Sequence, residues 1–495
     1  MTQIPRTSLM NGSVRMHTRS AQVLVVGGGP AGSTTATFIA RQGYQVVLAE
    51  RATFPRYHIG ESLLPSCLRI FDLLGVRQKI EAHGFVRKDG AHFEWSGEPW
   101  DIEFSNLAQS LYGFQVIRSQ FDKLLLEHAR SEGVEVMEAV EVKEINFDNG
   151  RPVTATLVDS NGVSGRISFD ILADASGRAG LMSTRYLHNR SFHDAFMNLA
   201  LWGYWKNARR LSIGPAGAIA TCSIPVGWIW AIPLHDETLS VGLVLHKSKF
   251  KELRQYFTLE EIYRNAIASS QLVTSLVESG DLASPLRIES DYSYAAERFA
   301  GPSYYLIGDA ACFLDPLLST GVHLATFSGL VAGASIVSTL NREVREVEAA
   351  QFYDVCYHRA YLRMLVVVAA FYQTHREKDT HFRHAQRLTS RDYRGSELIQ
   401  AFLHIVSGIE DLADVEDVQP QQLLDMLLLL YEEHYAFARL KGKWETLTLD
   451  EVNKGIARTR LVNAIQEDFS LTPETAVNGL YVATDPRLGL RRAPG

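Results

Sequence analysis

The stretch QVLVVGGGPAG, residues 22–32, decides the fold, because a short β-branched run ends directly in a glycine-rich turn. A helical pattern follows as far as Arg41, and a second strand-like run at 45–49 ends in Glu50. This order of strand, turn, helix and strand is typical of a βαβ unit, whose two strands lie parallel in one sheet. We therefore expect an α/β protein built on a Rossmann-type domain.

The glycines of this turn fit the GxGxxG pattern at Gly27, Gly29 and Gly32. The first allows a tight turn, the second lets the backbone approach a pyrophosphate, and the third allows helix and strand to touch. Glu50, at the end of the second strand, is placed to accept hydrogen bonds from ribose hydroxyls, and Arg51 follows it. The helix start directs unpaired N–H groups at the phosphates. The pattern predicts a bound dinucleotide.

Composition excludes several other classes of protein. The 495 residues are 46% hydrophobic and 21% charged, with a formal net charge of −7 and no block of like charge, so we expect a soluble globular protein that binds no nucleic acid. The longest apolar run, residues 364–372, is about half a membrane span, and the first 20 residues contain no apolar signal stretch. We expect no membrane association and a cytoplasmic location.

Four cysteines, Cys67, Cys222, Cys312 and Cys356, lie far apart and show no CxxC or Cys/His ligand spacing. We expect reduced thiols and no metal site.

Patterning along the chain predicts a discontinuous nucleotide-binding domain with a second domain inserted into it. Strands and helices alternate as far as about residue 180, strand-like runs rich in Gly, Pro and Trp follow, and helical pattern returns after Gly308. The expected division is a flexible tail at 1–20, a nucleotide domain at 21–90, 115–185 and 295–342, a sheet-containing substrate domain at 91–114 and 186–294, and a helical C-terminal region at 343–495.

Three further motifs resemble a large hydroxylase-like superfamily of flavoproteins. YLIGDAA, residues 305–311, resembles its GD motif, in which Asp309 would hold the ribityl chain of FAD. DASGR, residues 174–178, resembles its central DxxGR-type motif, and Arg118 resembles its FAD-binding arginine. The resemblance implies FAD as the dinucleotide and an architecture like that of p-hydroxybenzoate hydroxylase.

Two signatures resemble the flavin-dependent halogenases within that superfamily. GWIWAIP, residues 227–233, matches WxWxIP, and FLDPLLSTG, residues 313–321, matches FxxPxxSxG. The resemblance implies that Trp228, Trp230 and Pro316 line a tunnel beside the flavin and that Thr320 and Gly321 bind chloride. Backbone N–H groups in such a turn can form an anion nest without a charged side chain. Taken alone, the two tryptophans would be ordinary core aromatics.

A lysine completes this resemblance. GFVRKDGAHFEW, residues 84–95, resembles the segment of phenol-type halogenases that carries their essential lysine, which makes Lys88 the candidate; Ser96 stands where that segment has Gly. FPRYHIGESLLP, residues 54–65, resembles the family's loop over the flavin. Burial in a tunnel would lower the pKa of Lys88 and favour the neutral amine.

The resemblance implies a reaction in which a separate flavin reductase supplies FADH2. A flavin C4a-hydroperoxide would oxidise chloride to hypochlorous acid, and Lys88 would deliver the chlorine either as a chloramine or by hydrogen bonding to hypochlorous acid. The expected substrate is an electron-rich aromatic, phenol or tyrosine-like or a pyrrole, and it could be tethered to an acyl or peptidyl carrier protein. The basic stripe Arg383, Arg387 and Arg391 could dock such a carrier or be a solvated helix face.

Two alternatives remain open at this point. One is a flavin-dependent aromatic hydroxylase, which would need no halide, and the other is a non-enzymatic flavin- or carrier-binding protein.

Overall fold

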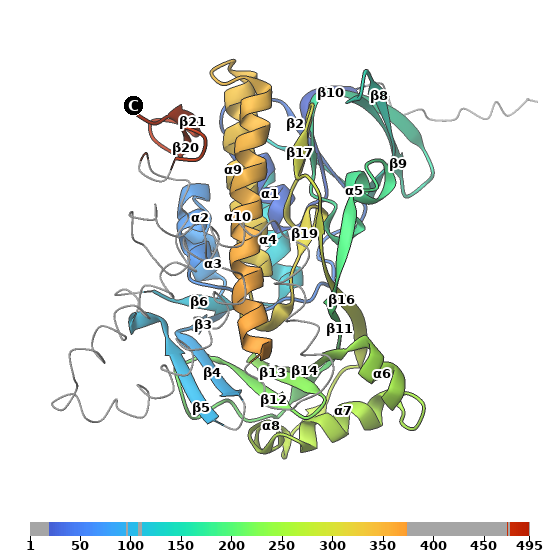
Figure 1. Ribbon diagram of the computed structural model, residues 1–495, viewed down its shortest axis with the longest axis vertical. Helices are drawn as coiled ribbons and strands as arrows, with labels where there is room; N and C mark the ends of the chain where they lie inside the picture. The colour runs from blue at the N-terminus through green and yellow to red at the C-terminus, as the bar shows by residue number, and fades with distance from the viewer. Residues whose placement is uncertain (1–18, 96–97, 107–110, 374–472, 474–475, 495) are drawn as a thin grey trace, which may run out of the picture.

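The computed structural model describes residues 19–95, 98–106, 111–373, 473 and 476–494. A largely parallel sheet, here called the first sheet, lies in the upper part of the molecule in Figure 1. Strand β1 runs parallel to β10 on one side and to β2 on the other. In spatial order the strands are β17 (Ala300–Gly301), β18 (Tyr304–Leu306), β10 (Ser164–Asp174), β1 (Arg19–Val26), β2 (Val46–Glu50) and β7 (Glu135–Glu138), with β9 (Arg151–Asp159) beside β10 and β8 (Val140–Asp148) beside β9.

Helices α1 (Pro30–Ala40) and α9 (Gly321–Leu340) pack against each other in the core. Two glycines permit this close approach, because a Cβ on Gly329 would lie 2.9 Å from Thr34 Cγ2 and a Cβ on Gly333 would lie 3.0 Å from Phe38 Cβ. Helix α9 is long and apolar enough to cross a membrane, but 94% of its most apolar stretch is buried inside the protein. It is therefore a core helix, and its burial explains its composition.

The other helices around the first sheet are α2 (Ser66–Leu74), α3 (Arg77–Ala82), α4 (Arg118–Ser131), α5 (Leu181–Arg185) and α10 (Glu346–Gln373), with the short 3-10 turn η2 (Gly177–Ala179). A second 3-10 turn, η1 (Phe104–Asn106), directly follows the strand β5 (Glu98–Glu103). The predicted βαβ unit and the α/β class are confirmed, since β1, α1 and β2 follow one another as the sequence pattern indicated.

The second sheet lies at the other end of the molecule (Figure 1). The long strands β11 and β16 pair antiparallel within it and extend toward the first sheet. In spatial order its strands are β19 (Cys312–Phe313), β16 (Arg287–Ala296), β11 (Arg190–Lys206), β14 (Leu239–His246), β13 (Gly227–Pro233), β12 (Ile219–Ile224), β4 (Gly90–Trp95) and β5 (Glu98–Glu103), with β15 (Asp281–Leu282) beside β11.

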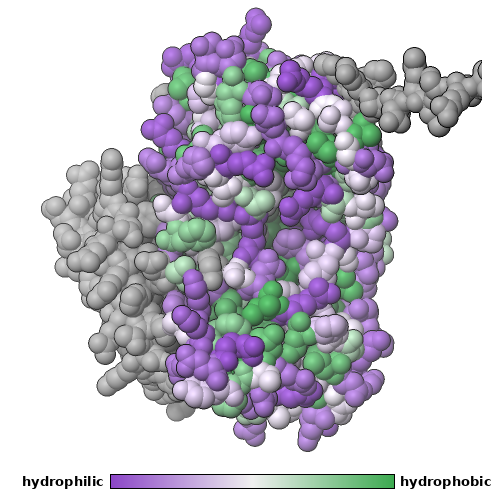
Figure 2. Space-filling model, turned by 90° about the vertical axis from the view of Figure 1, so that its right-hand side faces the viewer, coloured by the Kyte–Doolittle hydropathy of each residue, from purple (hydrophilic) through white to green (hydrophobic). Residues whose placement is uncertain are grey.

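The two faces of the second sheet bury different side chains. One face packs on α6 (Lys247–Leu253), α7 (Leu259–Ala268) and α8 (Gln271–Val277), through an aliphatic cluster. The other face carries a layer rich in tryptophan, here called the tryptophan layer: Trp95, Trp202, Trp228 and Trp230 with neighbouring aliphatic residues. Hydrophobic side chains also gather over the lower half of the surface seen in Figure 2, whereas the upper half is mostly hydrophilic.

Two short strands that belong to neither large sheet form a separate two-stranded ribbon. Strand β3 (Val86–Lys88) pairs antiparallel with β6 (Gly113–Gln115), and Ser62 forms an isolated bridge with Gln115. Through these pairings the ribbon brings together Lys88, Ser62 of the FPRYHIGESLLP stretch, and Gln115, which lies three residues before Arg118.

The C-terminal region differs in part from the expectation of helix over 343–495. Helix α10 agrees with it, but β20 (Leu480–Ala483) and β21 (Gly489–Arg492) form a hairpin that packs on α9. Leu480, Val482 and Leu490 are buried there, so this burial, rather than a helical period, determines the local structure. At the other end, the expected tail at 1–20 overlaps β1, which begins at Arg19 and pairs with Ile167.

Candidate active site

The glycine-rich turn between β1 and α1 is shaped by close backbone contacts. Gly27 has a φ of +104°, and a Cβ there would lie 2.3 Å from the carbonyl oxygen of Ala175. A Cβ on Gly32 would lie 1.9 Å from the carbonyl oxygen of Gly27. Side chains at either position would break the contact between turn, helix and neighbouring strand.

The second glycine of the pattern, Gly29, leaves room for a ligand. At Gly29 the nearest atom to an ideal Cβ is Nη2 of Arg56, at 3.3 Å, and Pro30 follows as the first residue of α1. An anion above this turn would meet helix N–H groups and a guanidinium, which fits a pyrophosphate. The arginine at position 56 was not singled out from the sequence, although it lies within the quoted FPRYHIGESLLP motif.

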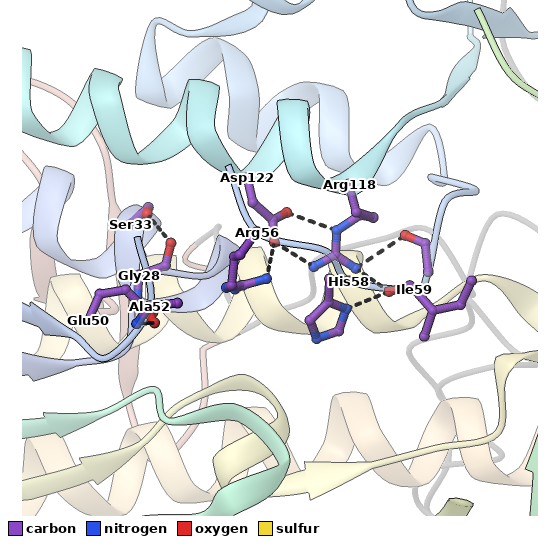
Figure 3. Close-up of polar contacts among 10 residues, drawn as sticks. Gly28, Ser33, Glu50, Ala52, Arg56, His58, Ile59, Arg118 and Asp122 are labelled. Carbon is purple, nitrogen blue, oxygen red and sulfur yellow. Dashed lines mark hydrogen bonds and ion pairs between the residues drawn. The ribbon is translucent and has the colours of Figure 1, made fainter. Parts of the chain in front are cut away.

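Glu50 lies at the end of β2 and is buried (Figure 3). Its Oε2 accepts a hydrogen bond from Gly28 N at 2.7 Å, and its Oε1 accepts one from Ala52 N at 2.8 Å. The carboxylate is thereby fixed beside the glycine turn, and each oxygen retains a lone pair for a ribose hydroxyl. Arg51, by contrast, is exposed.

Arg118, the first residue of α4, forms a buried ion pair with Asp122 one turn later (Figure 3). Its Nε and Nη2 donate to Asp122 at 2.8 and 3.0 Å, and its Nη1 donates to the carbonyl oxygen of Ile59 at 2.8 Å. Although burial opposes it, Arg118 together with Arg56 lowers the pKa of Asp122. In this structure Arg118 anchors the loop at residues 59–60, and Asp122, which sequence reasoning missed, orients it.

The GD motif forms the 3-10 turn η3 (Gly308–Ala310), which packs directly on α1. Gly308 has a φ of +59°, and a Cβ there would lie 2.8 Å from Ala31. Burial raises the pKa of the Asp309 carboxyl to about 6, opposed by Arg178, Arg118 and Arg190. The structure therefore brings Asp309 to the same side of the sheet as the glycine turn.

Lys88 ends β3 and is only 2% exposed. Its Nζ donates to Ser62 Oγ at 2.8 Å and lies 5.5 Å from the centre of the Phe104 ring. No carboxylate pairs with it among the residues that the structure describes. Burial lowers the pKa of Lys88 to about 7, so its neutral amine is available near neutral pH.

The tryptophans of the WxWxIP signature lie in the tryptophan layer, with ring centres of Trp228 and Trp230 6.0 Å apart. Trp230 Nε1 donates to Ser240 Oγ at 3.2 Å. Glu61, in the loop that Arg118 anchors, is 3% exposed and reaches the same sheet, because Tyr204 of β11 donates to its Oε1. Sequence reasoning did not single out Glu61, although it is the one acidic residue of the quoted FPRYHIGESLLP stretch.

The second signature forms the 3-10 turn η4 (Pro316–Leu318) and the start of α9. Asp315 caps η4 by accepting from Leu317 N at 3.0 Å, and Ser319 has a φ of +58°. No hydrogen-bond acceptor within the described part of the chain contacts the N–H groups of Thr320 and Gly321. These two groups lie at the positive end of a 20-residue helix, an arrangement that suits a small anion.

Among the residues that the structure describes, no group of His, Cys, Asp or Glu could hold a metal ion. All four cysteines are buried and unbonded to one another. The stripe Arg383, Arg387 and Arg391 and the position Ser96 lie outside the described residues.

Comparison with known proteins agrees with this geometry. The tryptophan halogenase family model matches residues 22–111 and 104–412. The chain is 45% identical to the tryptophan 2-halogenase of Chondromyces crocatus, over 96% of this chain and 94% of that protein. It is 41% identical to the flavin-dependent halogenase armH4 of Armillaria mellea, over 73% of each chain.

A solved structure gives the same result. The myxobacterial chondrochloren halogenase CndH superposes with a TM-score of 0.70 at 30% identity, covering 83% of this chain and 97% of that one. The fold and the glycine, Glu50 and Asp309 cluster thus define an FAD-binding enzyme. The chain belongs to the flavin-dependent halogenases of the tryptophan halogenase family. Such enzymes generally need a separate flavin reductase.

Proposed function

We propose that this halogenase uses FADH2, oxygen and chloride to chlorinate an electron-rich aromatic ring through Lys88. The observation that carries the proposal is the buried Lys88 amine, which donates to Ser62 and has no carboxylate partner among the described residues. Reduced FAD supplies, with oxygen, the oxidising power that converts a halide to a hypohalous acid. The glycine turn with Gly27, Gly29 and Gly32 would hold it there.

In this proposal, residues of the chain bind the halide, deliver the chlorine and exclude water. The unpaired N–H groups of Thr320 and Gly321 would bind chloride. Lys88 would receive the electrophilic chlorine, either as the amine that forms a chloramine or as an ammonium that polarises hypochlorous acid. Trp228, Trp230 and Pro316 would enclose the path between them and exclude water, which otherwise competes for the oxidant.

The substrate class in this proposal is a phenol or tyrosine-like ring, or a pyrrole. Electrophilic chlorination builds positive charge on the ring, and the oxygen or nitrogen lone pair of these rings stabilises it. The segment around Lys88 resembles that of phenol-type enzymes, which supports the phenol.

An indole is the second candidate. The relative from Chondromyces crocatus carries the name tryptophan 2-halogenase and matches 96% of this chain at 45% identity. Carbon 2 of an indole belongs to its pyrrole ring, so the two candidates share the same electronic demand. A carrier-tethered substrate and a cytoplasmic location also remain proposals.

The test is turnover of free tryptophan and of a panel of phenols and pyrroles, each free and carrier-loaded, with FAD, a reductase, NADH and chloride. We expect a chlorine isotope pattern by mass spectrometry with wild type and none with Lys88→Ala. Omitting chloride gives the control against a hydroxylase, because oxygen insertion without halide would overturn the proposal. Normal chlorination by Lys88→Ala would overturn only the lysine assignment.

A further inference from the structure

A line of hydrogen bonds connects the buried Glu61 to the protein surface. Tyr204 Oη donates to Glu61 Oε1 at 2.7 Å, and Tyr57 Oη lies 2.9 Å from Tyr204 Oη. Trp202 Nε1 donates to Tyr57 Oη at 2.7 Å. Since the single proton of Tyr204 goes to Glu61, Tyr57 must donate to Tyr204, so all the O–H groups point inward.

The outermost residue of this line is partly exposed to solvent. Tyr57 is 42% exposed, and the Arg287 guanidinium lies 3.8 Å from the centre of its ring, which holds the ring in place. The inner end does not reach solvent, because Glu61 is 3% exposed. The three oxygens therefore span from partly exposed surface to the tryptophan layer.

Glu61 has few polar partners for a buried acid. Its Oε2 is buried and has no hydrogen-bond partner, and no cation pairs with it among the described residues. Arg118 is the cation whose charge lowers the pKa of Glu61, but its hydrogen bonds go to Asp122 and to the carbonyl oxygen of Ile59. A buried carboxylate without a cationic partner is poorly stabilised, whereas the protonated acid would present one O–H to the interior.

We propose that Glu61 is the internal proton donor of this halogenase and that Tyr204 and Tyr57 reload it from solvent. The inference deepens the proposed function and rests on it for the proton demand of the reaction. FADH2, oxygen, chloride, one proton and the aromatic substrate give FAD, the chlorinated product and two water molecules. One proton is therefore consumed in each cycle, inside a site that must exclude bulk water.

Reloading can be written with every proton accounted for. As Glu61 regains its proton, the O–H bond of Tyr204 breaks and its proton moves to Oε1. The proton of Tyr57 moves to Tyr204, and a hydronium ion or buffer acid at the surface supplies the proton to Tyr57 and is left as water or as the conjugate base. The three transfers occur together, because burial raises the pKa of Tyr204 far above its usual value and makes its tyrosinate unfavourable.

The groups that face Glu61 favour this role. Burial raises the pKa of Glu61 to about 7, while Ser240, Tyr204 and Arg118 lower it and Asp236 raises it. Near neutral pH the acid can therefore both release and regain a proton, which is the condition for general acid catalysis.

The first experiment measures the proton itself, in the oxidised holoenzyme without turnover. We expect an infrared carbonyl band of a buried carboxylic acid that disappears in Glu61→Gln and shifts when the protein is mixed with deuterated water. In Tyr204→Phe this shift should be roughly tenfold slower, because the route to the surface is cut. Tyr263→Phe is the control and should exchange as wild type does, because Tyr263 is a buried tyrosine of α7, which packs on the opposite face of the same sheet.

The second experiment measures turnover of the same variants. Tyr204→Phe should lower kcat roughly 100-fold with unchanged FAD affinity, and it should raise the solvent deuterium isotope effect. In Glu61→Ala, added acetic acid should restore part of kcat, because a small acid can occupy the space of the lost carboxyl group.

The outcomes separate the two proposals. If wild type shows the exchanging carboxyl band but chlorinates no aromatic ring, the substrate proposal fails and the relay remains. If Tyr204→Phe exchanges and turns over like wild type, the relay is wrong while the halogenase stands.

Discussion

Asn198 Nδ2 donates a hydrogen bond to Asp315 Oδ2 at 2.6 Å, across 117 residues of sequence. Asn198 lies in β11 of the second sheet, and Asp315 caps the turn that leads to Thr320 and Gly321. Both side chains are buried. The contact therefore ties the proposed chloride turn to the strand that carries Tyr204 and Trp202, so the second sheet positions both the turn and the relay.

Replacing Asn198 should weaken the use of chloride and leave flavin binding unchanged. In Asn198→Ala the turn loses a charge-assisted hydrogen bond, which is worth about 1.5 to 3 kcal/mol, so we expect the KM for chloride to rise roughly tenfold or more. Chloride dependence of product formation measures this, and flavin fluorescence should report unchanged FAD affinity. Asn146→Ala, in β8 of the first sheet, is the control. An unchanged chloride KM would contradict the assignment.

The glycine turn predicts a sharp difference between two Gly→Ala variants. In Gly32→Ala the new Cβ would lie 1.9 Å from the carbonyl oxygen of Gly27, so the turn must open and FAD binding should be lost. In Gly321→Ala the Cβ meets nothing within 4 Å, so folding and FAD binding should be retained. Measurement of bound flavin after gel filtration compares them. Retention of FAD by Gly32→Ala would show that the cofactor lies elsewhere.

The buried ion pair of Arg118 and Asp122 should contribute far more to the free energy of unfolding than an ion pair at the surface does. In Asp122→Asn the buried guanidinium loses its counter-charge, and we expect a loss of about 3 kcal/mol in the free energy of unfolding. Asp72→Asn removes an exposed partner of Arg77 and should cost less than about 1 kcal/mol. Urea unfolding of both variants tests the contrast, and equal losses would mean that Arg118 does not depend on Asp122.

Lys88 and Glu61 should make the free energy of unfolding depend on pH in opposite directions. The folded-state pKa of Lys88 is about 7, below its usual 10.5, so between these values the unfolded chain binds more protons and stability rises with pH. The slope approaches about 1.4 kcal/mol per pH unit. Lys88→Met lacks this slope, so its stability relative to wild type should be highest below pH 7 and fall as the pH rises.

For Glu61 the folded-state pKa of about 7 lies above its usual 4.5, so the folded protein holds the proton and wild-type stability falls between these values. Glu61→Gln should therefore gain stability relative to wild type from pH 4.5 to 7 and stay level above it. Thermal unfolding over a pH series measures both variants. Parallel profiles for the two would contradict the burial assigned to one of them.

Local motifs carried most of what could be predicted. The residues of the βαβ turn and Glu50 were found from their spacing, because the turn lies where a strand ends and a helix begins and Glu50 ends the second strand; Asp309 was found from the resemblance of its motif. The helical expectation for 480–492 failed because a hairpin that packs on α9 has no local helical or strand period strong enough to announce it.

By itself, the sequence determined the nucleotide turn, the family signatures and the candidate Lys88, since each depends on residues that are close along the chain. Only the tertiary structure decided which side chains meet those motifs: Ser62 at Lys88, Asp122 at Arg118, Asn198 at Asp315, and Tyr204 at Glu61. Three of these four contacts join separate segments, and the surrounding packing removes them from water. Hydrogen-bond partners and pKa values follow from that burial, which no local pattern of residues specifies.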